Sequence, residues 1–140
     1  GFACTRSEVS GRRLWSFFRA LYPTPDDFFR TFFVANYCPL VFMEESGRNL
    51  TPDKLPAAER TALYAACDRH LAAIVRATTP EFVIGVGAFA TKRAREALGE
   101  IAGLEFATLP HPSPASPLAN RGWDGLARSA LMPLGLLPGT

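Results

Sequence analysis

The chain has 140 residues, which is long enough to bury a hydrophobic core and short enough for a single domain over residues 1–140. Hydrophobic residues make up 48% of it and charged residues 20%, a balance typical of soluble globular domains. Arg, Asn or Pro interrupts each long apolar run, so no transmembrane helix is expected. The net charge of +2 says little about partners, and three scattered cysteines favour a reducing compartment over a disulfide framework.

The predicted secondary structure alternates between helices and strands. In chain order, the patterns predict a helix over 7–21 capped by Ser7, a helical turn over 26–29, a strand over 31–36, a loop over 44–56, a helix from 56 or 57 to 77, a strand over 82–86, a helix over 90–99, a strand over 104–109 and a helix over 122–134. This alternation predicts an α/β fold with a parallel β-sheet flanked by helices. The positions expected to face the core in the two longest helices are Val9, Leu14, Trp15, Phe18 and Leu21, then Leu63, Ala66, Cys67, His70 or Leu71, and Ile74.

Three residues lie at the carboxyl ends of the predicted strands, namely Asn36, Gly87 and His111. Ligand sites in α/β sheets gather at the carboxyl ends of the strands, so these residues are expected to share one site. The asparagine amide offers one acceptor and two donors, which suits the hydrogen-bonding edge of a pyrimidine. Taken alone, an asparagine at a strand end is more typical of a turn.

The histidine begins a proline-rich loop that runs from His111 to Trp123. Three prolines, Pro112, Pro114 and Pro117, fix φ and bias each preceding residue to extended geometry. The loop therefore either holds the histidine in a fixed direction or is an ordinary surface turn with an incidental histidine. Within it, Ser116 can cap a short helix with Pro117 at its first position.

Other patterns carry weaker signals. Gly85 and Gly87 lack the third glycine of a dinucleotide-binding motif, and Cys67 with His70 lacks two further ligands for a metal, so neither a cofactor nor a metal is expected. Two basic clusters suit phosphate contact, although each alone is better explained as a solvated helix face. They comprise Arg6, Arg12, Arg13 and Arg19, and Lys92, Arg93 and Arg95.

Six sequence blocks in this order resemble a known family. They are residues 7–11 (SEVSG), 36–40 (NYCPL), 46–52 (SGRNLTP), 83–87 (VIGVG), 93–95 (RAR) and 111–123 (HPSPASPLANRGW). Together they are similar to the single-strand-selective monofunctional uracil-DNA glycosylase (SMUG) family of the uracil-DNA glycosylase superfamily. The resemblance implies a monomeric base-excision repair enzyme that hydrolyses the N-glycosidic bond of uracil and of oxidised 5-substituted uracils in single- and double-stranded DNA. It implies no membrane and no cofactor, with a cytoplasmic or nucleoid location in a bacterium and a nuclear one in a eukaryote.

The resemblance also implies roles for particular residues. Asn36 would read the edge of the flipped uracil, and His111 would donate a hydrogen bond to the uracil anion as it leaves. The family uses an arginine and an asparagine where this chain has Ala115 and Ser116, which changes the wedge expected to enter the DNA. The residues expected to contact DNA are Gly87, Ala88, Pro112, Ser113, Pro114, Ala115, Ser116, Pro117, Asn120 and Arg121.

The family's first motif carries the asparagine that positions the attacking water, and it lies upstream of the block that here begins at Ser7. The chain is therefore expected to be the carboxyl-terminal part of the domain, incomplete at its N-terminus and inactive by itself. Two alternatives remain open. One is an inactive nucleic-acid-binding remnant, and the other is an α/β module that binds a small phosphorylated ligand.

Overall fold

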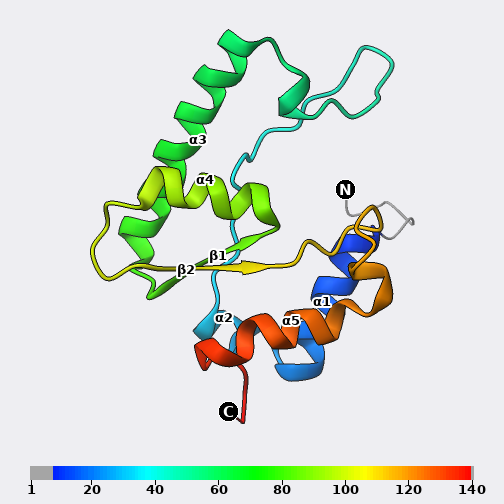
Figure 1. The fold of residues 1–140 in the computed structure, drawn as a ribbon, viewed down its shortest axis with the longest axis vertical. Coiled ribbons are helices and arrows are strands. Elements are labelled where there is room, and N and C mark those ends of the chain that lie inside the picture. Colours follow the sequence, from blue (N-terminus) through cyan, green and yellow to red (C-terminus); the bar gives the residue numbers. More distant parts are fainter. Residues whose placement is uncertain (1–7, 140) are drawn as a thin grey trace.

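The computed structural model describes residues 8–139, in which two layers of helices enclose a small parallel sheet (Figure 1). The sheet pairs β1 (Phe82–Val86) with β2 (Glu105–Leu109), and the register runs from Phe82 opposite Glu105 to Val86 opposite Leu109. α4 (Ala88–Leu98) connects the two strands, because parallel strands need a crossover between them. The chain is thus α/β, with a parallel sheet flanked by helices, which confirms the predicted fold class.

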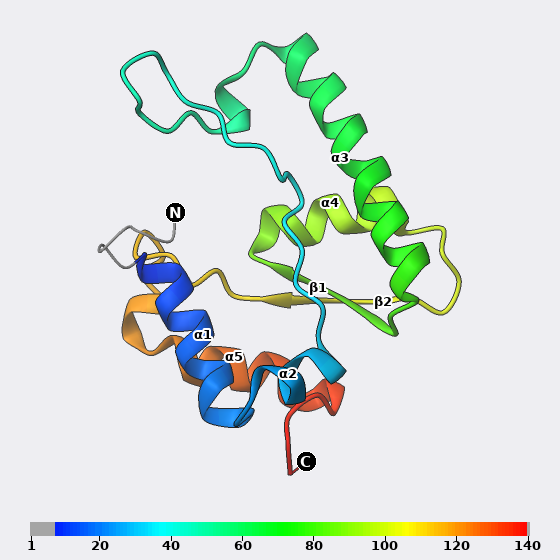
Figure 2. The ribbon, with the colours of Figure 1, turned by 180° about the vertical axis from the view of Figure 1, so that it is seen from behind.

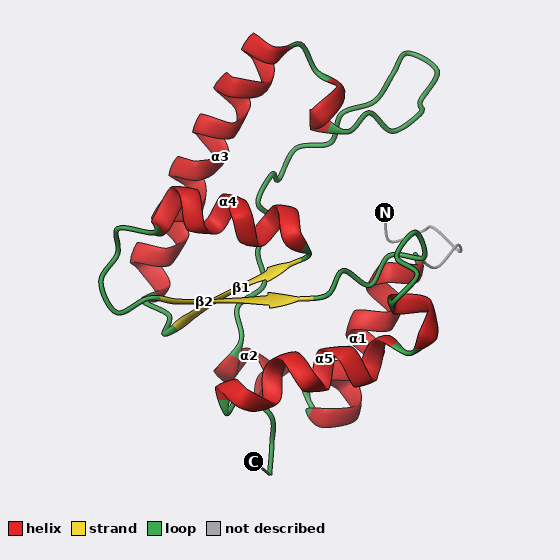
Figure 3. Cartoon of the chain, viewed as in Figure 1, coloured by secondary structure: helices red, strands yellow, loops and turns green. Residues whose placement is uncertain are grey.

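The helices divide between the two faces of the sheet (Figure 3). α3 (Ala57–Thr78) packs on α4, while α5 (Trp123–Leu131) packs on β2 from the other side and contacts α1 (Val9–Leu21). α2 (Pro25–Thr31) joins the α1 and α5 layer. Three short 3-10 helices complete the described elements, at Pro52–Lys54, Ala119–Arg121 and Met132–Leu134.

Two apolar clusters form because side chains on a strand alternate between the faces of the sheet. Ile84 and Val86 pack against the larger cluster, and Val83 and Phe106 pack against the smaller one. The larger cluster is built around Phe17, Phe18, Phe28, Leu109, Ala119, Trp123, Ala127, Leu131 and Leu137. The smaller cluster is built around Val75, Ala94 and Leu98.

A glycine allows α4 to lie directly on the sheet. A Cβ added to Gly85 in β1 would come within 2.3 Å of the backbone nitrogen of Thr91 in α4. Thr91 is itself buried, and its hydroxyl donates to the Gly87 carbonyl at 3.1 Å. The close packing fixes the first turn of α4 against the carboxyl end of β1.

The strand predicted over 31–36 is absent from the structure. α2 extends to Thr31, and residues 32–36 have no ladder partner among residues 8–139. The backbone of Phe32 is extended, as expected for an aromatic residue beside another aromatic residue in the sequence. A β-strand also needs the edge of another strand to pair with, and this segment has none among the described residues. Figure 2 shows this segment crossing in front of the two strands as a loop, and Phe33 is 66% exposed. Asn36 is therefore not at the end of a strand.

Several other predictions need correction. Ser7 lies outside the described residues, and the carboxylate of Glu8 caps α1 by accepting from the backbone N–H groups of Ser10 and Gly11. His70, expected near the core, is exposed. The side of α3 that faces the core carries Cys67 and Val75, which are buried, and His70 lies outside that side.

Element boundaries differ in smaller ways. In α1, Phe17 is buried whereas Trp15 is 40% exposed. The predicted loop over 44–56 contains a short bridge between Met43 and Asn49, and the final helix changes to 3-10 geometry at Met132, next to Pro133. Across residues 8–139, none of the helices combines the length and apolar character needed to cross a bilayer.

Candidate active site

Gly87 and His111 lie against each other at the carboxyl ends of the two strands. Gly87 has φ of +92°, a backbone conformation that residues with side chains rarely adopt. Its N–H donates to the Leu109 carbonyl at 2.8 Å, which continues the hydrogen bonding between β1 and β2 one residue past the end of β1. A Cβ placed on Gly87 would lie 3.2 Å from both Cβ and Cδ2 of His111. The glycine therefore provides both the turn into α4 and the space for the histidine.

The hydrogen bonding of His111 determines which ring nitrogen carries the proton. The backbone N–H of Ser113 donates to Nδ1 of His111 at 3.1 Å. A neutral imidazole has one proton, so a ring that accepts at Nδ1 carries that proton on Nε2. His111 is exposed, and its Nε2 makes no hydrogen bond to residues 8–139, although the Glu8 carboxylate lies close enough to interact with the ring electrostatically. The Nε2–H is thus available to an acceptor on a bound molecule.

The loop that carries His111 is held by hydrogen bonds as well as by its prolines. Nε1 of Trp123 donates to the Pro110 carbonyl at 2.7 Å. The side-chain nitrogen of Asn120 donates to the Pro114 carbonyl at 2.8 Å. Because Trp123 is itself buried in the larger apolar cluster, the start of the loop is fixed to the core.

Local turns shape the middle of this loop. The N–H of Ala115 donates to Oγ of Ser113 at 3.1 Å, and the N–H of Ser116 donates to the Ser113 carbonyl at 3.0 Å. Oγ of Ser116 accepts from the N–H of Ala119 at 3.5 Å, as a weak cap. Ser116 therefore accepts at the start of a helical turn, as predicted, but the 3-10 helix itself begins at Ala119, two residues later than the predicted start at Pro117.

Arg13 is a loop-holding residue that sequence reasoning missed. From α1, its Nη1 donates to the Pro112 carbonyl at 3.0 Å and its Nη2 donates to Oδ1 of Asn120 at 2.8 Å. The sequence grouped Arg13 with other arginines that suit phosphate contact. Its partners lie 99 and 107 residues further along the chain, so no local pattern could have shown this role.

The remaining predicted DNA-contact residues lie near the same edge of the sheet. Ala88 is exposed as the first residue of α4, whose N-terminus has no side-chain cap. Pro114 and Pro117 are exposed, whereas Pro112 is buried. Arg121 is exposed and makes no ion pair with residues 8–139.

Asn36 reaches this region through its neighbour in the chain. Asn36 is exposed, and its amide makes no hydrogen bond to the part of the chain that the structure describes. The ring of Tyr37 lies 5.9 Å from that of Phe89, measured between centroids. Phe89 is in the first turn of α4, two residues after Gly87, which contacts His111. Both Asn36 and His111 are thus placed relative to the N-terminus of α4.

The structure gives no support to a metal site around Cys67. Burial, followed by a hydrogen bond with Cys38, raises the pKa of Cys67 to about 11. This thiol is therefore protonated at neutral pH. Within residues 8–139, no group of three His, Cys, Asp or Glu side chains is arranged to hold a metal ion.

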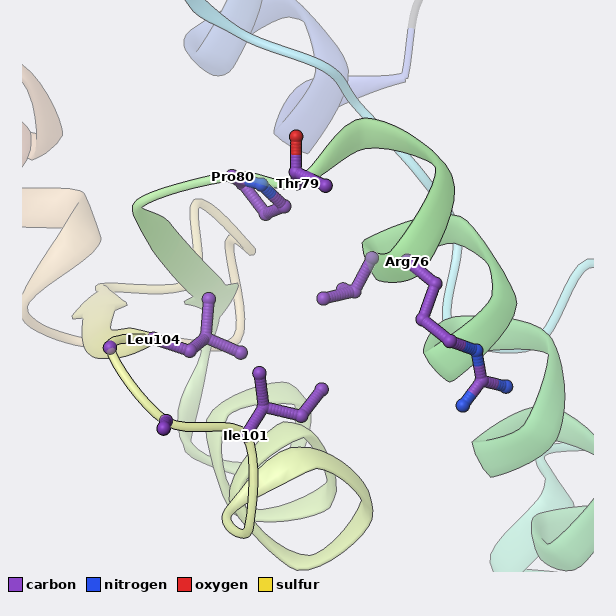
Figure 4. Close-up of a pocket in the computed structure, with 8 residues that line it drawn as sticks. Arg76, Thr79, Pro80, Ile101 and Leu104 are labelled. Atoms are coloured by element: carbon purple, nitrogen blue, oxygen red, sulfur yellow. The ribbon is translucent and has the colours of Figure 1, made fainter.

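Among the cavities lined by described residues, two open to solvent bear on the position of the site. One of about 390 Å³ lies beside Pro80 and Leu104, before the two strands, and Figure 4 shows Arg76, Thr79 and Ile101 around it. It is at the opposite end of the strands from His111. The second, of about 320 Å³, adjoins the Asn36 region and is lined by Tyr37, Cys38, Thr51, Pro52, Asp53, Tyr64 and Phe89.

Comparisons with known proteins agree with the resemblance found in the sequence. The family model described as "Uracil DNA glycosylase superfamily" matches residues 2–127. Relatives named single-strand selective monofunctional uracil-DNA glycosylase come from Rattus norvegicus and Mus musculus, each 50% identical over 139 residues, and from Bos taurus, 48% identical over 139 residues. These alignments cover 99% of this chain and 50–51% of each relative, so the chain spans about half the length of the curated relatives it matches.

Proposed function

Because the chain belongs to the uracil DNA glycosylase superfamily, we propose that it takes part in the hydrolysis of the N-glycosidic bond of uracil in DNA. The observation that carries this proposal is the hydrogen bonding of the His111 ring. Its Nδ1 accepts from the Ser113 backbone at 3.1 Å, so its Nε2–H is a donor beside the Gly87 turn. A hydrogen-bond donor in this position suits a leaving group that becomes an anion.

The chemistry that this donor would assist is the loss of uracil as an anion. As the bond between C1′ of the sugar and N1 of the base breaks, its electron pair passes to the base and charge builds on the uracil O2. Water adds to C1′, and the proton it gives up completes the balance on the released base. A donor at His111 Nε2 strengthens as the charge grows, so it stabilises the transition state more than the bound substrate. We assign no described residue to orienting the water.

Asn36 is proposed to read the base. Uracil presents N3–H as a donor and O4 as an acceptor, and a single amide can satisfy both. The Asn36 amide has no hydrogen bond to another described residue, which leaves both its functions for a ligand. The target base must first leave the stack, because neither the sugar carbon nor the base edge is accessible inside a duplex.

The DNA backbone is proposed to lie across the uncapped N-terminus of α4 at Gly87 and Ala88, where backbone N–H groups favour phosphate. On the loop over 112–117 and at Arg121, exposed groups would face the strand. Leu118 is 60% exposed beside Pro117, and an apolar side chain there is suited to entering a base step. The Asn120 amide already bonds Arg13 and Pro114, so we assign it to loop shape.

The test is uracil release from a single-stranded oligonucleotide, followed by alkali cleavage at the abasic site. Two preparations are compared, residues 1–140 alone and a chimera that joins this chain to the half of the rat relative it does not match. We expect release by the chimera, and a loss on the order of a hundredfold in single-turnover rate for His111→Ala with little change in DNA binding.

The same assay separates the alternatives. Salt-dependent DNA binding without release from either preparation would favour the inactive remnant and overturn the proposal. An absence of both DNA binding and release would favour the module for a small phosphorylated ligand. Equal losses of rate and binding in His111→Ala would make His111 a positioning residue.

A further inference from the structure

The direction of the Asn36 amide depends on its neighbours in the chain. Asn36 itself makes no hydrogen bond to residues 8–139, and the segment over 32–36 has no ladder to hold it. The fixed contacts begin at the next residue, Tyr37. Whatever holds Tyr37 therefore sets where Asn36 is presented.

Two side chains from separate helices, Asp68 and Arg93, hold Tyr37 in a closed set of hydrogen bonds. The Tyr37 hydroxyl donates to Oδ1 of Asp68 in α3 at 2.7 Å, and it accepts from Nε of Arg93 in α4 at 2.9 Å. Nη2 of Arg93 donates to Oδ2 of the same carboxylate. The side chains of Arg93 and Asp68 are 18% and 26% exposed, so salt screens their attraction less than it would at the surface.

Ring contacts hold the same residue from its sides. The Tyr37 ring packs edge-on against Phe89 at 5.9 Å between centroids, and it lies 6.2 Å from the ring of Tyr64. The Arg93 guanidinium lies 4.9 Å from the centroid of Tyr64. Burial of the Tyr37 hydroxyl, with its bond to Asp68, raises its pKa, so it remains a donor at all working pH values.

α4 connects the hydrogen bonds around Tyr37 to the loop that begins at His111. Its first turn follows Gly87, against which His111 packs, and its second turn carries Arg93. A displacement of the Asn36 backbone relative to His111 would pull on Tyr37, and the bonds of Tyr37 to Arg93 and Asp68 oppose that movement. The helix therefore serves as a common reference for both residues.

We propose that Arg93 and Asp68 are positioning residues that, through Tyr37, hold the Asn36 amide at the distance and angle needed to read uracil. This inference rests on the proposed function of Asn36. It assigns no contact with substrate to Arg93 or Asp68, and it predicts that their effect on the reaction passes entirely through Asn36.

A double-mutant cycle tests this route. Single-turnover uracil release is measured with the chimera in excess, for Arg93→Ala in the wild-type and in the Asn36→Ala background. A misplaced Asn36 amide is expected to lower the single-turnover rate by about 10- to 100-fold, so Arg93→Ala should show a loss of that size in the wild-type background. In the Asn36→Ala background the further loss should be below about twofold, because no amide remains to be positioned.

Two further variants separate positioning from folding. Arg69→Ala removes a guanidinium from an exposed position next to Asp68, outside both basic clusters, and it should leave the rate unchanged. Tyr37→Phe keeps the ring against Phe89 and removes only the hydroxyl, so it should reproduce part of the Arg93→Ala loss with little change in melting temperature.

Each outcome decides the matter. Equal losses from Arg93→Ala in both backgrounds, or no loss in either, would overturn the positioning role while leaving the proposed function intact. A wild-type rate in Asn36→Ala would instead remove Asn36 from the site, and the absence of release from the unmutated chimera would overturn the proposed function; the inference falls with either.

Discussion

Replacing Gly87 by alanine tests how the turn into α4 makes space for the histidine. Gly87 has φ of +92° and ψ of 161°, a region that only glycine adopts without strain. Forcing a Cβ-bearing residue into it costs about 1–3 kcal/mol. The new Cβ would also lie 3.2 Å from the Cβ and Cδ2 of His111, closer than ordinary van der Waals contact. We therefore expect lower stability together with a displaced imidazole.

The matched control is Gly103→Ala. Gly103 also has a positive φ, of +80°, but a Cβ there would meet no atom within 4 Å. Both variants should unfold at a lower urea concentration, and Gly87→Ala should lose more stability because it adds the close contact with His111 to the backbone strain. Only Gly87→Ala should lose uracil release in the chimera, by at least tenfold, because only it moves the donor. If the two variants release uracil at the same rate, the contact with His111 does not matter for the reaction.

Three further predictions concern other parts of the chain. Arg13→Ala should lower the free energy of unfolding by about 1–3 kcal/mol, because it removes two hydrogen bonds donated by a charged group. It should also speed hydrogen exchange in the loop over 112–121. Arg12→Ala, on the exposed side of α1, should do neither. Hydrogen bonds from Gly11 and Ser10 lower the pKa of Glu8, so its cap stabilises the fold above about pH 5 and is lost as the pH falls through the folded-state value. Melting temperatures from pH 3 to 7 should therefore fall less on acidification in Glu8→Gln than in the wild type. Residues 1–140 alone should melt with low cooperativity and bind a hydrophobic dye, because large apolar side chains of the segment over 33–43 are exposed; a sharp melt without dye binding would contradict this.

The parts of the fold that the sequence predicted are those built from neighbouring residues. The run over 82–86 gave β1 with the correct boundaries, and β2 and α4 were placed within two residues of theirs. Because both strands are parallel and adjacent, their ends also predicted that Gly87 and His111 would meet. This reasoning needed no information from beyond the β1–α4–β2 unit.

The sequence reasoning failed where a contact joins distant segments. The residues over 31–36 have a β-rich composition, but composition cannot supply a partner edge, and the segment is a loop. Likewise Arg93 had the appearance of a solvated helix residue, and only the structure places it on Tyr37 and Asp68. Such roles depend on which helix faces which loop.

The hydrogen bonds of Arg13 join segments that are far apart in the sequence, and this separation affects the order in which the molecule folds. β1, α4 and β2 close within about thirty residues, so their pairing requires little loop entropy and is expected early in folding. The loop after β2 gains its bonds to α1 only when segments 99 and 107 residues apart have met. The arrangement of the loop that carries His111 is then among the last features to form, and pulse-labelling hydrogen exchange would detect protection of β1 and β2 before protection of residues 112–121. A protein that reached its compact shape without docking α1 would keep the Trp123 bond at the start of the loop, but the loop that carries His111 would lack both hydrogen bonds from Arg13.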